Sequence, residues 1–319
     1  IHFVLCNITI GLFVLILLCM KRIFKHCLTP RMQFNLWIPF TISLLVPFLP
    51  VSFSTLSTKM QDLFHPLAHF SHTVHTTNTS EYTSSSTNQI YDYAISMRTR
   101  FPAYISTIFC VIWGIGMFVM LFSFVRSLVL LHHMRRTANL MQDKRIHAIY
   151  MTCLSELQLR KSIPLYSSSI IDTPVSTGIL RPAIFLPLHC ISNFEEQEIR
   201  YILLHELMHC YYKDAIFNYC MNIIRILYWF HPLIWLITKE FYTERELACD
   251  TSVLRSLGAN EQISYGVTLL HFVDKQTNTP LSLLNNLSEN AKQMKRRILN
   301  IKQHQPLTIQ KKLRSILSF

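Results

Sequence analysis

The sequence has little charge and very little glycine for its length. Only 15% of its 319 residues are charged, while 50% are hydrophobic and the mean hydropathy is +0.27. This balance argues against an ordinary soluble globular protein and indicates a chain that lies in a membrane. Six glycines are few for a β-rich or doubly wound fold of this length, so we expect a mainly α, multi-span membrane protein.

Paired cysteines are also missing. The nine cysteines are scattered, and no C-x-x-C pair occurs. This argues against a disulfide framework and a closed structural zinc site, and it indicates that the catalytic part faces a reducing cytosol. The net charge is +12, but Lys and Arg gather at the ends of apolar runs, as the positive-inside rule predicts. We therefore expect no direct contact with nucleic acid.

Long apolar runs are what the sequence does have, and they predict the membrane topology. Residues 1–53 contain two runs long enough to span a bilayer, joined by a short basic loop that we place in the cytoplasm. The N-terminus is then outside, and so is the polar segment 54–102. A third span over 103–131 ends in basic residues and returns the chain to the cytoplasm. Residues 132–277 then form a cytoplasmic domain, 278–312 a cytoplasmic linker, and 313–319 the start of a fourth span.

The cytoplasmic domain contains the pattern H-E-x-x-H at His205, Glu206 and His209. On a helix, His205 and His209 project from one face, so both imidazoles can bind one tetrahedral zinc ion. Glu206 is rotated by about 100° from His205, which suits a general base rather than a third ligand. Zinc lowers the pKa of a bound water to roughly 7, and a nearby carboxylate can accept its proton. The pattern predicts a zinc hydrolase, although two His and a Glu also occur together by chance on helix surfaces.

A catalytic zinc needs a third protein ligand, and the sequence offers one downstream. Glu246 and Asp250 are four residues apart on one helical face, so Glu246 can bind the metal while Asp250 holds the free ring nitrogen of a ligand histidine. The apolar stretch 215–237 lies between them and the histidines. We predict that 215–240 forms a membrane-associated hairpin, because a single crossing would put Glu246 on the wrong side of the bilayer. The alternative is a single span and no zinc site.

Two further local patterns precede the histidines. Ser192 to Glu195 reads as a capping box, so we expect the motif helix to begin near Asn193. Residues 162–171 and 183–186 read as strands, and prolines lie at both ends of the second. We predict that Ala183, Ile184, Phe185 and Leu186 form an edge strand that binds an extended substrate. The alternative is a small hairpin that only covers the core.

Together these features resemble the BlaR/MecR-type family of integral-membrane zinc metallopeptidases, the antirepressors of bacterial β-lactam resistance. The resemblance covers essentially the whole chain. It rests on an ordered set of motifs: P-x-x-x-G-x-x-x-P-x-x-x-L-P from Pro174 to Pro187, H-E-L-M-H from His205 followed by Asp214, W-F-H-P from Trp229, E-x-x-x-D from Glu246, and K-R-R-I-L-N-I-K from Lys295.

The resemblance implies an α+β, gluzincin-like cytoplasmic domain that binds Zn²⁺ through His205, His209 and Glu246, with Glu206 as general base and Asp250 orienting a ligand. It also implies a multi-pass protein of the bacterial plasma membrane that cleaves a cytoplasmic repressor in response to a β-lactam. The lipid bilayer and a second copy of the chain are further expected partners. The family's external penicillin-binding sensor has no S-x-x-K or K-T-G motif here, so the sequence is either a fragment or a member without that sensor.

Several interpretations stay open at this point. The enzyme could instead be a housekeeping membrane zinc protease of the stress-induced or CAAX type, because these share H-E-x-x-H and a distant E-x-x-x-D. A non-catalytic membrane receptor is the third alternative. The polar linker from Asn278 to Asn290 is a candidate self-cleavage site, since it is tethered near the metal. Alternatively, the basic run that follows it only marks the cytoplasmic end of a fourth span.

Overall fold

The computed structural model describes residues 2–24, 28–45, 103–159, 161–277 and 287–303. Its helical part toward the N-terminus consists of α1 (His2–Phe24), α2 (Pro30–Asn35), α3 (Trp37–Leu45) and α6 (Ala103–Thr137). The predicted segments 54–102 and 313–319, and residues 278–286 and 304–312 of the predicted linker, lie outside the described residues.

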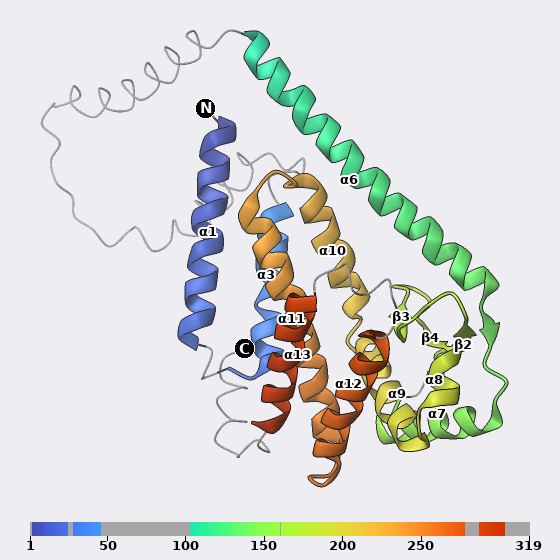
Figure 1. Cartoon of the computed structure of the whole chain (residues 1–319). Coiled ribbons are helices and arrows are strands. Elements are labelled where there is room, and N and C mark those ends of the chain that lie inside the picture. The colour runs from blue at the N-terminus through green and yellow to red at the C-terminus, as the bar shows by residue number, and fades with distance from the viewer. Residues whose placement is uncertain (1, 25–27, 46–102, 160, 278–286, 304–319) are drawn as a thin grey trace, which may run out of the picture.

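The helix α6 is the described element best suited to cross a membrane. It contains one stretch, Thr107–Thr137, that is long and apolar enough for this, and it is the one such helix found among the described residues. Large apolar side chains along it are exposed, such as Phe109 (65%) and Phe118 (67%). Figure 1 shows α6 running along one side of the molecule, so these side chains would face lipid.

A small mixed sheet follows α6. It contains β1 (Asn139–Leu140), β2 (Leu165–Ser168), β3 (Val175–Thr177) and β4 (Ala183–Pro187) in the order β1-β2-β4-β3. β4 pairs in parallel with β2 and antiparallel with β3, with Ser176 opposite Ile184. All five residues of β4 are buried. The prediction of an edge strand at Ala183–Leu186 is therefore wrong, and β3 is the edge strand on this side.

The sheet packs on a group of helices that contains the H-E-x-x-H motif. The sheet contacts α8 (Leu188–Asn193) and α9 (Glu196–Tyr211), and the helices α7 (Lys144–Glu156), α12 (Glu261–Thr277) and α13 (Leu287–Lys302) belong to the same apolar core. α9 is buried along most of its length. Its capping box uses Glu195 and Glu198 rather than Ser192 and Glu195. The predicted box is wrong because the short helix α8 occupies Ser192, so α9 starts three residues later.

The apolar stretch after α9 folds back on itself as a helical hairpin. α10 (Asp214–Leu227) and α11 (Pro232–Ser256) are joined by residues 228–231, directly before Pro232. A proline in the first turn of a helix costs no hydrogen bond, whereas within a longer helix it would remove one, so the break occurs here. Figure 1 shows the two helices side by side with the turn at one end.

The tip of this hairpin packs closely on α6. The indole nitrogen of Trp113 donates to the carbonyl of Leu227 (3.3 Å), and that of Trp229 donates to the carbonyl of Trp113 (3.2 Å). A Cβ on Gly116 would lie 2.2 Å from ring carbons of Trp229, so only glycine allows this approach. The hairpin therefore lies against the candidate span, and its association with the membrane stays a prediction.

The first helices pack on the other side of the hairpin, and one of them places a buried positive charge against α11. Lys21 belongs to the last turn of α1 rather than to a free loop, and its ammonium contacts the carboxylate of Glu244 in α11. The indole of Trp37 donates to the same carboxylate (2.7 Å), and Lys21 lies 3.7 Å above that ring. An apolar cluster surrounds these groups, formed by Phe34, Phe40, Met221, Ile224, Ile234, Ile237 and Phe241 among others.

Candidate metal centre

The two histidines of the motif lie on one face of α9. Their rings are nearly perpendicular (89°), with centroids 4.7 Å apart, and the Nε2 atoms of His205 and His209 are 3.2 Å apart. The four-residue spacing on a helix causes this arrangement, and the burial of α9 fixes it. Both Nε2 atoms therefore point toward the same small region of space.

Glu246, on the second helix of the hairpin (α11), adds a carboxylate to this region. Its Oε2 lies 3.3 Å from Nε2 of His205, and its Oε1 lies 3.8 Å from Nε2 of His209. Ligand atoms bound to one zinc at about 2.0–2.2 Å, at tetrahedral angles, lie roughly 3.3–3.6 Å apart. The two imidazoles and the carboxylate thus fit a zinc ion with three protein ligands, and the alternative in which 215–237 separates Glu246 from His205 is wrong.

Cys249 lies one helical turn beyond Glu246 and offers a competing ligand set. Potential ligand atoms of Cys249, His205 and His209 all lie within 4.8 Å of one another. However, Sγ of Cys249 is 3.6 Å from Nδ1 of His205 and 3.4 Å from its carbonyl oxygen, so it contacts the ring nitrogen that points away from Glu246. Its side chain is also fully buried, whereas Glu246 lines a pocket. A catalytic metal must be reached by water and substrate, which favours Glu246.

A carboxylate stands behind each histidine. Nδ1 of His209 lies 2.8 Å from Oδ2 of Asp214, and Nδ1 of His205 lies 3.4 Å from Oδ1 of Asp250. A carboxylate can only accept, so each Nδ1 carries the proton and each Nε2 keeps a lone pair for a metal. An aspartate at the start of a helix is often its cap, but here Lys213 is the cap residue of α10 and the side chain of Asp214 contacts His209 instead.

Tyr265 in α12 is a contributor that sequence reasoning missed. Its hydroxyl donates to Oδ1 of Asp250 (2.6 Å) and lies 3.0 Å from Nδ1 of His205, where it can accept the ring proton. The side chain is fully buried. The hydroxyl therefore connects Asp250 to His205 and makes the orientation of this histidine depend on α12.

Two arginines flank Glu246. Nη2 of Arg245 lies 2.6 Å from its Oε1, and Nη1 of Arg297 lies 3.6 Å from its Oε2. Burial alone would raise the pKa of the Glu246 carboxyl, but Arg245, together with His205, His209 and Arg297, holds the pKa well below its ordinary value. Glu246 is therefore ionised, as a metal ligand must be.

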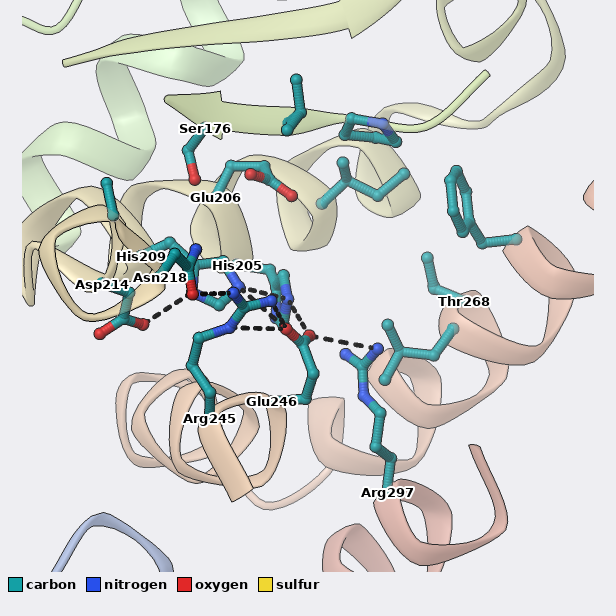
Figure 2. Close-up of a pocket in the computed structure, with 16 residues that line it drawn as sticks. Ser176, His205, Glu206, His209, Asp214, Asn218, Arg245, Glu246, Thr268 and Arg297 are labelled. Atoms are coloured by element: carbon teal, nitrogen blue, oxygen red, sulfur yellow. Dashed lines mark hydrogen bonds and ion pairs between the residues drawn. The ribbon is translucent and has the colours of Figure 1, made fainter. Parts of the chain in front are cut away.

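The three candidate ligands and Glu206 open into one pocket of about 300 Å³. Glu206 is 8% exposed, and Figure 2 shows it beside Ser176, across the pocket from Arg245 and Glu246. A substrate bound in the pocket would therefore have Glu206 on one side and the candidate metal ligands on the other. The lining residues include Val175 and Ser176 of β3, Ile202, Asn218, Thr268, Leu269 and Phe272.

The structure thus brings together five of the residues singled out from the sequence, namely His205, Glu206, His209, Glu246 and Asp250. It does not bring the strand Ala183–Leu186 to the pocket, and both edges of β4 are already paired within the sheet, so this strand cannot pair with a substrate backbone. The strand that lines the pocket is β3, whose residues stand between Pro174 and Gly178. The unbroken apolar run from Ala183 to Pro187 was the signal for an interior strand in the sequence, and all five residues are buried.

Comparison with known proteins identifies the family of the chain. The family model described as BlaR1 peptidase M56 matches residues 1–301. The chain belongs to this family. It is 30% identical to the regulatory protein BlaR1 of Bacillus licheniformis over 322 residues, which cover 100% of this chain and 53% of that protein. The BlaR/MecR-type resemblance seen in the sequence is confirmed.

Two other relatives are less similar in sequence. The methicillin resistance protein mecR1 of Staphylococcus aureus is 26% identical over 75% of this chain and 40% of its own length. BlaR1 of the same species is 24% identical over 91% of this chain and 48% of its own length. The chain therefore spans about half the length of the curated relatives it matches.

Proposed function

We propose that this protein is a membrane zinc metalloendopeptidase of a signal-transduction system. The observation that carries the proposal is the meeting of Nε2 of His205, Nε2 of His209 and the Glu246 carboxylate, within 3.2–3.8 Å of one another, in the pocket that also holds Glu206. His₂Glu with an open fourth position is the ligand set of zinc peptidases. Belonging to a peptidase family supports the same chemistry.

The residues of the chain then have distinct tasks. Zn²⁺, when bound, would polarise the substrate carbonyl and acidify a water. Glu206 accepts a proton from the attacking water and passes it to the nitrogen of the leaving amine. Asp214 and Asp250 keep the histidines in the tautomer that leaves Nε2 free. Arg245 holds Glu246 in place and keeps it ionised.

The shape of the pocket supports an extended peptide as substrate. β3 has one edge paired with β4 and borders the pocket, so its other edge can pair with a substrate backbone. One wall is apolar, with Ile202, Leu269 and Phe272, which suits a large apolar side chain beside the scissile bond.

The biological substrate in this proposal is a cytoplasmic repressor, and the signal is a β-lactam outside the cell. The relatives named BlaR1 and mecR1 support a role in regulation and resistance. The catalytic domain lies in the cytoplasm of a multi-pass plasma-membrane protein with its N-terminus outside. The linker within 278–312 is proposed as a second, self-cleaved substrate. A second copy of the chain is a further proposed partner.

The proposal is tested with the full chain in lipid nanodiscs. Wild type and Glu206→Gln are compared for zinc content and for cleavage of the repressor and of the chain itself, followed by mass spectrometry. We expect equal zinc but a roughly 10²- to 10⁴-fold slower cleavage in the variant. Glu196→Gln, on an exposed glutamate of the same helix, is the matched control. Equal cleavage by wild type and Glu206→Gln would contradict the proposal.

The housekeeping protease is the remaining enzymatic alternative. In cells, a signalling enzyme cleaves the repressor only when the β-lactam is present, whereas a housekeeping enzyme cleaves its substrates at a constant rate. Comparing repressor cleavage with and without the β-lactam therefore separates the two.

A further inference from the structure

One arginine from the last described helix reaches into the metal centre. Arg297 of α13 makes two hydrogen bonds to Asp250, from Nε to Oδ2 (2.8 Å) and from Nη2 to Oδ1 (2.7 Å). Its Nη1 lies 3.6 Å from Oε2 of Glu246. Only 12% of the side chain is exposed, and the paired Asp250 is fully buried. Figure 2 shows the guanidinium directed at Glu246 across the pocket.

We propose that Arg297 is a positioning residue of the zinc centre, so that the centre is complete only when α13 is docked. This inference rests on the proposed function. Arg297 affects two of the three candidate ligands. It orients His205 through Asp250, and it contacts Glu246 directly.

The geometry of Asp250 explains why an arginine is needed. Its Oδ1 also accepts from Tyr265 and faces Nδ1 of His205, while Oδ2 is held by Nε of Arg297. A bidentate guanidinium fixes the plane of the carboxylate, which a single hydrogen bond cannot do. Without it, Asp250 can rotate about its side chain, and the ring of His205 loses its orientation toward the other two ligands.

The neighbouring Arg296 shows that this contact is more than an anchor for α13. Arg296 makes an equally short pair of bonds to Glu240 of α11 (2.8 and 2.7 Å). Its side chain is 40% exposed, however, and does not line the pocket. α13 is held in addition by Ile301, which is buried in the core, and by Asn300, which donates to Thr251. Loss of either arginine alone should therefore leave the helix docked.

The test compares Arg297→Ala, Arg297→Lys and the control Arg296→Ala in the full chain. Zinc affinity is measured by competition with a chelator, and site geometry by the visible absorption of the Co²⁺-substituted protein. We expect Arg297→Ala to weaken zinc binding about 10- to 100-fold and to change the Co²⁺ spectrum. Arg296→Ala should stay within about twofold of wild type. Arg297→Lys should fall between, because lysine keeps the charge but cannot bind bidentately.

Two outcomes would overturn the inference in distinguishable ways. In the first, wild type binds zinc, and both Arg297 variants bind it as tightly as Arg296→Ala and have unchanged Co²⁺ spectra. Arg297 then does not position the ligands, while the proposed function stands. If wild type itself binds no zinc, both fall together. Should Arg297→Ala fail to fold, the comparison of Arg297→Lys with Arg296→Ala gives the same decision.

Discussion

Nη1 of Arg31 lies 3.7 Å from Oδ1 of Asp214, the carboxylate whose other oxygen contacts His209. Arg31 belongs to α2, just after the first helix, and its guanidinium carbon is 3.4 Å from the ring centroid of Tyr212. Both facing atoms are buried, and neither makes a hydrogen bond within the described residues. The N-terminal helices therefore contact a candidate zinc ligand through one carboxylate.

Replacing Arg31 should weaken the metal centre. Arg31→Ala leaves Oδ1 of Asp214 buried without its cationic neighbour, so we expect zinc affinity to fall, by up to about 10-fold. Arg22→Ala removes an exposed arginine from the end of α1 and should have no such effect. Chelator competition on both variants checks this, and equal affinities would show that α2 does not act on the site.

The hydroxyl of Tyr265 should contribute more to zinc affinity than its ring does. Tyr265→Phe removes one donor to Asp250 and one partner of His205, both buried. We expect a loss of about 1–3 kcal/mol in the free energy of unfolding, and weaker zinc binding. Tyr201 is equally buried and its ring packs against Tyr265, but its hydroxyl contacts Gln197. Tyr201→Phe should therefore keep zinc affinity, measured side by side with Tyr265→Phe. Matching affinities in the two variants would contradict this role.

The buried pair of Lys21 and Glu244 should show strong coupling. Lys21→Met leaves the Glu244 carboxylate buried, with Trp37 as its remaining polar contact among the described residues. We expect this variant to lose about 3–5 kcal/mol in the free energy of unfolding. The double variant with Glu244→Gln removes both charges and should recover much of this loss. Denaturant unfolding of the four proteins forms a double-mutant cycle. Additive effects would show that the pair is not a unit.

Burial of Cys153 predicts a dependence of stability on alkaline pH. Burial, with a smaller effect of Glu156, raises the pKa of this thiol from 9.0 to about 12. Between these values the unfolded chain loses the proton while the folded chain keeps it. The stability contribution of this thiol is therefore complete below pH 9 and falls by about 1.4 kcal/mol per pH unit up to pH 12. Cys153→Ala should show a shallower decline in unfolding free energy over this range, and parallel curves would contradict the prediction.

The candidate metal ligands could be selected from the sequence more completely than the residues around them. Regular spacing on single helices was enough to select His205, His209 and Glu246, because the face of a helix follows from residue number. Tyr265 and Arg297 could not be found in this way, since each reaches the site from a separate helix. Tyr265 belongs to no motif, and K-R-R-I-L-N-I-K, which contains Arg297, does not indicate that this side chain reaches the metal centre. Asp214 was ambiguous, because an aspartate at a helix start is just as often a cap.

The strands were predicted less well for a similar reason. β3 has three residues, and the sequence around it, between Pro174 and Gly178, reads as a turn. Its pairing with β4 is what makes it an edge strand, and such pairing is a property of the sheet rather than of local sequence. The hairpin α10–α11 was predictable because Pro232 marks a break and because the zinc ligands had to meet.

Metal analysis of two variants decides whether His205, His209 and Glu246 together hold one zinc ion. Zinc content and the Co²⁺ absorption spectrum are measured for wild type, Glu246→Gln and Cys249→Ser. We predict one zinc per chain in wild type and in Cys249→Ser, no thiolate-to-cobalt charge-transfer band, and loss of the metal in Glu246→Gln. Loss of zinc in Cys249→Ser while Glu246→Gln retains it would show that the Cys249 thiol, and not the Glu246 carboxylate, is the third ligand.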